Sequence, residues 1–137
     1  MSKYRYLEHT ADIGVIAEGK TQAEAYEAAA LGLENLMTDT SKVQPLVKRG
    51  IDLKSADRES LLVDFLNELV YLFDTQMLVF SRFEITEIGA ARLKAMVYGE
   101  VIDPKRHQVH LGVKAATYHQ LLVSHNAGWH VQVIFDI

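Results

Sequence analysis

Apolar side chains recur with two different periods along this chain. In residues 19–40 and 55–75 they return every three or four positions, which predicts two helices. Alternation with period two predicts strands elsewhere, at 3–8, 11–18, 47–54, 77–85, 92–101, 107–114, 117–125 and 129–137. We therefore expect an α+β fold in which two helices pack on a mainly antiparallel sheet of six to eight strands. The strands after residue 77 are expected to form a meander.

Both helices carry start signals. Thr21 and Glu24 have the spacing of a capping box, and Ser55 or Asp57 can cap the second helix. The first helix is rich in alanine, so its slim surface can lie close against a neighbour. The second has the broadest apolar stripe, made by seven residues: Leu61, Leu62, Phe65, Leu66, Leu69, Leu72 and Phe73.

Composition narrows the class of protein. A chain of 137 residues with 49% hydrophobic side chains fits one domain, 1–137, with a sizeable core. The absence of cysteine excludes disulfides and thiolate zinc sites. A net charge of -4 lacks the basic excess of a typical nucleic-acid binder, so we expect no strong direct contact with RNA. Neither a signal peptide nor an apolar run of about 18 residues is present, and we expect a soluble, cytoplasmic protein without membrane contact.

Asp12 is the first candidate for chemistry. It stands in the stretch "TADIGVI", which otherwise has the pattern of an apolar strand. A carboxylate removed from water is costly unless it is hydrogen-bonded, paired with a cation or bound to a metal. Asp12 therefore either accepts backbone hydrogen bonds at the start of a strand or binds a cation.

Asp136 is the second candidate. In the last strand, alternation separates it from the apolar face and groups it with His130, Gln132 and Ile134. The sequence ends at Ile137, so a terminal carboxylate there would lie within a few ångströms of the Asp136 side chain. If the opening strand lies beside the closing one, Asp12 joins them in a site for a hard cation such as calcium or magnesium. The plainer alternative, favoured by spacing alone, is that Asp136 lies at a frayed end.

Other catalytic patterns are weak. The six histidines show no pair with the helical i, i+4 spacing of a zinc hydrolase. Lys114, Tyr118 and His119 fall together near a turn, where the lysine meets an anionic partner, meets the Asp12 cluster, or is simply solvated. No serine lies in a nucleophile elbow, and no glycine pattern forms a phosphate loop.

Five stretches in fixed order resemble the archease family across residues 4–137: "HTADIGV", "DRESLLVDFLNELVYLFD", "YGEVIDPKRH", "VKAATYH" and the ending "VIFDI". The resemblance implies a non-catalytic accessory protein for the GTP-dependent RNA ligase RtcB, which acts in tRNA splicing and RNA repair. Archeases promote guanylylation of the ligase, allow multiple turnover and broaden its nucleotide use.

The resemblance also implies site residues. It assigns a divalent metal ion, calcium first with magnesium or manganese as alternatives, to Asp12, Asp136 and an oxygen of Ile137. It assigns ligase activation to Asp12, Lys114 and Asp136. We expect His9 and His119 around this site, where they support the ligands.

Two rival functions stay open. A metal-dependent hydrolase would use the same carboxylates with His119 as a base. A chaperone or general protein-interaction module would instead use the polar face of the second helix, with Asn67, Glu68 and Tyr71 as contacts.

Overall fold

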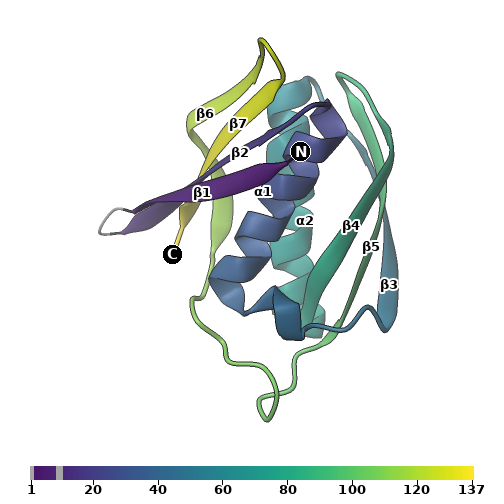
Figure 1. The fold of residues 1–137 in the computed structure, drawn as a ribbon, viewed down its shortest axis with the longest axis vertical. Coiled ribbons are helices and arrows are strands. Elements are labelled where there is room, and N and C mark those ends of the chain that lie inside the picture. The colour runs from purple at the N-terminus through teal and green to yellow at the C-terminus, as the bar shows by residue number, and fades with distance from the viewer. Residues whose placement is uncertain (1, 9–10) are drawn as a thin grey trace.

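The two helices lie side by side between two antiparallel sheets (Figure 1). This computed structural model describes residues 2–8 and 11–137. One sheet has the order β1-β2-β7-β6, from Lys3–Glu8, Asp12–Gly19, Trp129–Asp136 and Ala115–His125. The other has the order β3-β5-β4, from Val47–Lys54, Arg92–Val101 and Leu78–Ile88. The helices are α1 (Gln22–Met37) and α2 (Arg58–Gln76), with a short 3-10 turn, η1, at Thr40–Lys42.

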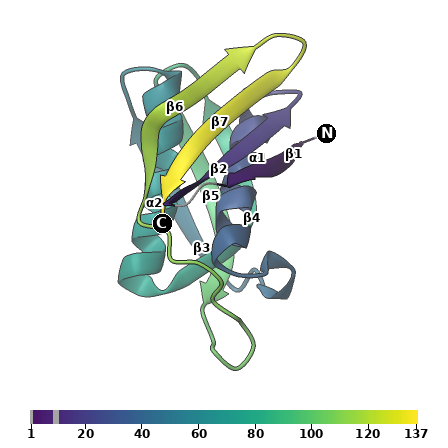
Figure 2. The ribbon, with the colours of Figure 1, turned by 90° about the vertical axis from the view of Figure 1, so that its left-hand side faces the viewer.

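The expected α+β class with two helices and mainly antiparallel strands is confirmed, but the single meander is wrong. The strands after residue 77 divide between the sheets: β4 and β5 join β3, whereas β6 and β7 join β2 and β1. In Figure 2 the four-stranded sheet faces the viewer with the helices behind it. Neither helix of the described chain has the length and apolar character needed to cross a bilayer.

The alanines of α1 are explained by this layered arrangement. The helix contacts the four-stranded sheet on one side and β4 on the other, so nearly every face of it is buried. Gly32 lies so close to β2 that an added Cβ would stand 2.9 Å from Val15 Cγ1. The predicted cap is confirmed, because Thr21 Oγ1 accepts from the Glu24 N–H at 3.1 Å and Glu24 Oε1 accepts from the Lys20 N–H at 3.0 Å.

Asp57, rather than Ser55, caps α2. Its side chain accepts the Ser60 N–H at 2.7 Å, while the Ser55 hydroxyl donates to Asp64 at 2.6 Å. The predicted apolar stripe is buried, except that Phe73 is only partly so. Met77 ends the helix in the left-handed region at φ 56.

The strand expected at 107–114 is absent, although its residues alternate. Its backbone forms no strand ladder. The Gln108 carbonyl accepts from the Thr38 hydroxyl at 2.8 Å, and the His110 N–H donates to the Met37 carbonyl at 2.8 Å. Its last residue, Lys114, donates a single backbone N–H to the Asp136 carbonyl of β7. This segment is part of a crossover, residues 102–114, that carries the chain from one sheet to the other (Figure 2).

Two glutamates of α1 cover the outer edge of β4. Glu34 Oε1 accepts the Phe80 N–H at 3.1 Å, and Glu27 Oε2 accepts the Ile85 N–H at 2.8 Å. Each of these N–H groups stands just before a register shift in the β4–β5 ladder. The helix thus supplies acceptors to the edge of β4 that faces away from β5.

Glu34 occupies an unusual environment for a carboxyl group. It is fully buried, and its Oε2 makes no hydrogen bond within the described residues. Burial raises the pKa of Glu34 well above its ordinary value, and the Phe80 N–H offsets this only in part. The group therefore stays protonated in the folded state at pH values where the unfolded chain has already lost the proton.

Replacing Glu34 should change how stability depends on pH. Because the folded pKa is raised, the folded state is favoured most below the ordinary value of 4.5 and loses stability as the pH rises toward the folded pKa. Glu34→Gln removes that loss, so the variant should match the unaltered protein near pH 4 and be the more stable of the two at pH 7. Urea unfolding at a series of pH values measures the difference.

Glu87→Gln, an exposed substitution on β4, is the matched control and should leave the pH dependence nearly unchanged. Parallel stability curves for Glu34→Gln and the unaltered protein would contradict the prediction.

Candidate functional site

Asp12 and Asp136 face each other across neighbouring strands. The two residues are direct partners in the antiparallel ladder of β2 and β7, so the adjacency expected from the sequence is confirmed. Partners of this kind place their Cβ atoms about 4.5–5.5 Å apart on one face. Because the residues next to them, Ile13 and Phe135, point into the core, both carboxylates lie on the outer face. We call this pair the acidic tip.

Asp12 is the more enclosed member of the acidic tip. Its Oδ1 is buried and finds no hydrogen-bond partner among the described residues. Asp136 is exposed at the end of its strand. The sequence left open that Asp12 only accepts backbone hydrogen bonds, but this does not account for its Oδ1. That oxygen is available to bind a cation.

The carboxylate oxygens of the acidic tip are the kind of ligand that hard cations prefer. Like charges directly opposite each other in a ladder repel, and a divalent cation between them removes that cost. No group of three histidine, cysteine, aspartate or glutamate side chains is placed to hold a metal within residues 2–8 and 11–137. A cation here would therefore use the two carboxylates together with main-chain oxygens and water.

Lys114 lies beside the acidic tip through its backbone. Its N–H donates to the Asp136 carbonyl at 2.8 Å, and the next residue, Ala115, is the ladder partner of Asp136. The Lys114 side chain is exposed. Ile137 is half-buried against the core, which fixes the chain where it leaves Asp136. His9 falls outside the described residues.

An irregular stretch of β6 brings His119 to a cavity beside Asp12. The β6–β7 register shifts between Thr117 and Leu122, and Gln120 takes a left-handed φ of 51. A cavity of about 140 Å³ lies at this place, lined by Asp12, His119, Gln120 and Ile134. The structure thus brings His119, but no second histidine of the described residues, to this cavity. Backbone strain of this kind often accompanies a functional site.

Asn67 of α2 braces β6 next to the acidic tip. Its Oδ1 accepts the Ala116 N–H at 2.8 Å and its Nδ2 donates to the Ala116 carbonyl at 3.2 Å. The expectation that Asn67 belongs to an exposed contact face is wrong, because both ends of its amide are used inside the molecule. Tyr71 is exposed, whereas Glu68 is half-buried, and burial raises the pKa of its carboxyl.

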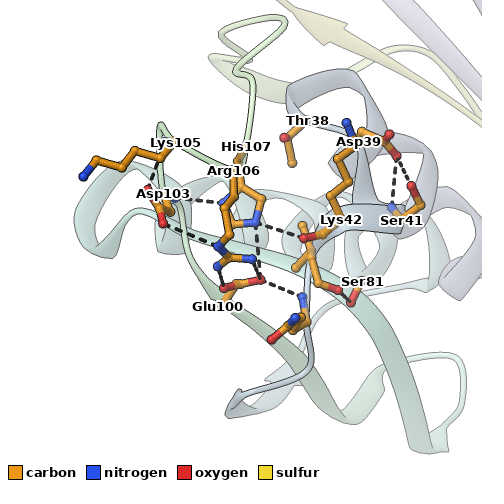
Figure 3. Close-up of polar contacts among 12 residues, drawn as sticks. Thr38, Asp39, Ser41, Lys42, Ser81, Glu100, Asp103, Lys105, Arg106 and His107 are labelled. Atoms are coloured by element: carbon orange, nitrogen blue, oxygen red, sulfur yellow. Dashed lines mark hydrogen bonds and ion pairs between the residues drawn. The ribbon is translucent and has the colours of Figure 1, made fainter.

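A second polar cluster fixes the crossover that leads to Lys114 (Figure 3). Arg106 pairs with Glu100 at the end of β5 and lies 3.4 Å from an Asp103 oxygen. The Gln44 N–H donates to Glu100 at 2.7 Å. Burial would raise the pKa of Glu100, but the Arg106 guanidinium and the Gln44 N–H hold it below its ordinary value. Glu100 therefore remains a charged anchor.

His107 is the buried centre of this cluster. Its Nδ1 accepts the Asp103 N–H at 2.8 Å, so the neutral ring carries its proton on Nε2. That nitrogen lies 3.1 Å from the Lys42 carbonyl and 3.3 Å from Glu100. The sequence pattern did not predict this role. The spacing of Asp103, Arg106 and His107 in "DPKRH" was the available signal, and it becomes interpretable only when Glu100 is placed beside it.

Fold and site together define the class of protein. It is an α+β domain with two helices between two antiparallel sheets and with two carboxylates paired at the ends of neighbouring strands. The model of the Archease protein family (MTH1598/TM1083) matches residues 4–137. The chain is 46% identical to protein archease of Methanosarcina mazei over 98% of this chain and 96% of that one. It is 38% identical to protein archease of Sulfolobus acidocaldarius over the full length of both. This chain belongs to the archease family.

Solved structures agree with the fold. The solution structure of Methanobacterium thermoautotrophicum protein 1598 superposes with a TM-score of 0.82 at 34% identity, covering 98% of each chain. The crystal structure of an archease, possible chaperone, from Thermotoga maritima superposes with a TM-score of 0.66 at 20% identity, covering 96% of this chain and 94% of that one. The second likeness concerns the fold alone.

Removing the Asn67 side chain should loosen the strand beside the acidic tip. Asn67→Ala leaves the buried Ala116 N–H and carbonyl without their partners, which costs about 1–3 kcal/mol. The free energy of unfolding should fall by that amount, and amide exchange at Ala116 should accelerate. Tyr71→Ala, on the exposed side of the same helix, is the control. Unchanged exchange at Ala116 in Asn67→Ala would contradict the bracing role.

Proposed function

We propose that this chain is a non-catalytic accessory protein that activates an RtcB-type, GTP-dependent RNA ligase in tRNA splicing and RNA repair. It promotes guanylylation of the ligase, allows repeated turnover and broadens nucleotide use. We expect this activity in the cytoplasm. Membership of the archease family supports the proposal, and the single observation that carries it is the pairing of Asp12 with Asp136 on neighbouring strands.

Asp12, Asp136 and the main-chain oxygen of Ile137 would hold a divalent cation, calcium first and magnesium or manganese as alternatives. The unpartnered Oδ1 of Asp12 supports this assignment. A bound cation supplies positive charge between the two carboxylates and a centre for further oxygen ligands.

The acidic tip acts by reaching the metal and nucleotide pocket of the ligase. Asp136 is exposed and Asp12 borders an open cavity, so both carboxylates can approach a second protein. The Lys114 backbone is fixed to Asp136 while its side chain is exposed. Its ammonium group can therefore contact a phosphate of the ligase-bound nucleotide without moving the tip.

Neutralising either carboxylate should abolish activation. In a guanylylation time course of the ligase, Asp12→Asn and Asp136→Asn should each lower stimulation by roughly tenfold or more. Lys114→Ala should lower it as well, with cation binding retained. Asp74→Asn and Lys105→Ala, both exposed substitutions outside the acidic tip, are the matched controls. Full stimulation by Asp12→Asn would refute the proposal.

Chelation should destabilise the unaltered protein and spare the tip variants. A cation bound only by the folded state adds ~2.7 kcal/mol at a concentration 100-fold above its Kd. Unfolding with calcium, with magnesium, with manganese and with a chelator measures this difference. Asp12→Asn should show little response to any ion and, without ions, should be as stable as the unaltered protein or slightly more so, because like-charge repulsion is relieved. Equal responses of both proteins would argue against a cation at the tip.

A chaperone role is the second candidate, favoured by the description of the Thermotoga maritima archease as a possible chaperone. Tyr71→Ala should then impair suppression of client aggregation more than Asp12→Asn does, since Tyr71 is 56% exposed. A hydrolase would instead turn over a nucleotide or phosphoester with no ligase present, and Asp12→Asn would abolish that turnover.

A further inference from the structure

Two side chains of the β6–β7 hairpin and one from the start of α2 stack at the end of the four-stranded sheet opposite the acidic tip. His125 and Trp129 are partners across the hairpin of β6 and β7. Their rings stack with centroids 4.3 Å apart and an interplanar angle of 11°. The Arg58 guanidinium, from the first residue of α2, lies 5.5 Å from the centre of the indole ring. The turn of this hairpin is at the upper end of the sheet in Figure 2, and the C-terminus is below it.

The backbone beneath this group is held firmly. The buried Tyr26 hydroxyl donates to the Arg58 carbonyl at 2.6 Å. Burial raises the pKa of Tyr26 to about 12, so the phenol keeps the proton that it donates. The hairpin turn is closed by the Asn126 N–H, which donates to the Gly128 carbonyl at 2.9 Å. Hydrogen bonds therefore fix the backbone on both sides of the stack, at the start of α2 and at the hairpin turn.

The same residues line a cavity of about 350 Å³, together with Val123 and Glu59. Arg58 and His125 are exposed, and the other lining side chains are half-buried. The cavity thus combines two flat rings, one guanidinium, one carboxylate and an apolar side chain. None of these groups belongs to the acidic tip, because Trp129 and Asp136 begin and end β7 and stand roughly 23 Å apart at 3.3 Å per residue.

Each group matches one part of a nucleotide. Aromatic rings provide stacking surfaces for nucleobases, to which histidine and arginine planes also contribute. A guanidinium binds a phosphate through paired, charge-assisted hydrogen bonds. A carboxylate accepts from the exocyclic amino group of a base. The volume is at the lower end of the range for small-molecule sites, which suits one nucleotide and no more.

We infer that the cavity between the β6–β7 hairpin and the start of α2 is a binding site for a single nucleotide, with the base on the His125–Trp129 stack and the phosphate at Arg58. One such contact is compatible with a net charge of -4, because it needs one cation rather than a basic groove. The nucleotide is either free or part of a single-stranded RNA, and both present the same base and phosphate. The inference does not depend on the ligase role.

Trp129 is the sole tryptophan in the sequence, so its indole N–H gives one resolved NMR signal at the site. The full chain is titrated with adenosine, with adenosine and guanosine monophosphates, and with a six-residue oligoadenylate RNA. We expect saturable shifts of this signal with the phosphate-bearing ligands and weaker binding of adenosine. Tighter binding of the RNA identifies single-stranded RNA as the source of the ligand. Tighter binding of the monophosphates identifies the free nucleotide.

Arg58→Gln and His125→Ala separate the two parts of the site. Loss of the guanidinium should raise the Kd for a monophosphate roughly tenfold and change adenosine binding little, because only the phosphate loses charge-assisted hydrogen bonds. Loss of the imidazole should weaken both ligands. Arg82→Gln is the matched control, because Arg82 also lies over an aromatic ring, 4.8 Å from the centre of Tyr98.

Binding that Arg58→Gln and His125→Ala leave within twofold of the unaltered protein would overturn the inference. The absence of saturable shifts with every ligand would overturn it as well. Activation of the ligase is scored separately in these variants. If these variants lose nucleotide binding but still activate the ligase, the inference is supported and the role of the acidic tip is unaffected.

Discussion

The enclosure of α1 between two sheets is the constraint on which the rest of the structure depends. A helix buried on nearly all sides must present small side chains wherever a sheet comes close. Ala25 and Ala29 are fully buried, and an added Cβ at Gly32 would also stand 3.1 Å from Tyr4 on β1. Tyr6 completes the contact by donating its hydroxyl proton to the Gly32 carbonyl at 2.9 Å. This close approach sets the position of β2, and with it the position of Asp12. The alanines thus act on the site through backbone placement.

Local periodicity was sufficient to predict the helices, most strands and the two faces of β7. It was not sufficient to divide the strands between sheets, because period two tells which side chains share a face and not which strand lies alongside. The segment 107–114 illustrates the limit. It alternates like a strand, but His107 is buried in the Glu100 cluster, and the backbone of Gln108 and His110 bonds to the end of α1. Sequence pattern cannot distinguish these two outcomes.

Polar residues on helices were the other source of error. Asn67 and Glu34 both look like ordinary polar positions in a helical pattern, yet each satisfies a strand edge, at Ala116 and Phe80 respectively. Their roles depend on which strand edge happens to face the helix, which is a long-range property. The sequence predicted more of the candidate site than of these helix roles. Asp12 and Asp136 stood out as acidic residues at the ends of two predicted strands. The assumption that these two strands are neighbours was enough to place both residues in one site.

The pairing of β2 with β7 also bears on how the molecule assembles. Asp12 and Asp136 stand near opposite ends of the sequence, so their contact is among the least local in the fold and is entropically expensive to close. A partly folded form in which β7 has not yet docked has no acidic tip. A ligand that requires both carboxylates therefore recognises only the completed molecule, and the acidic tip reports on the folding state of the whole chain.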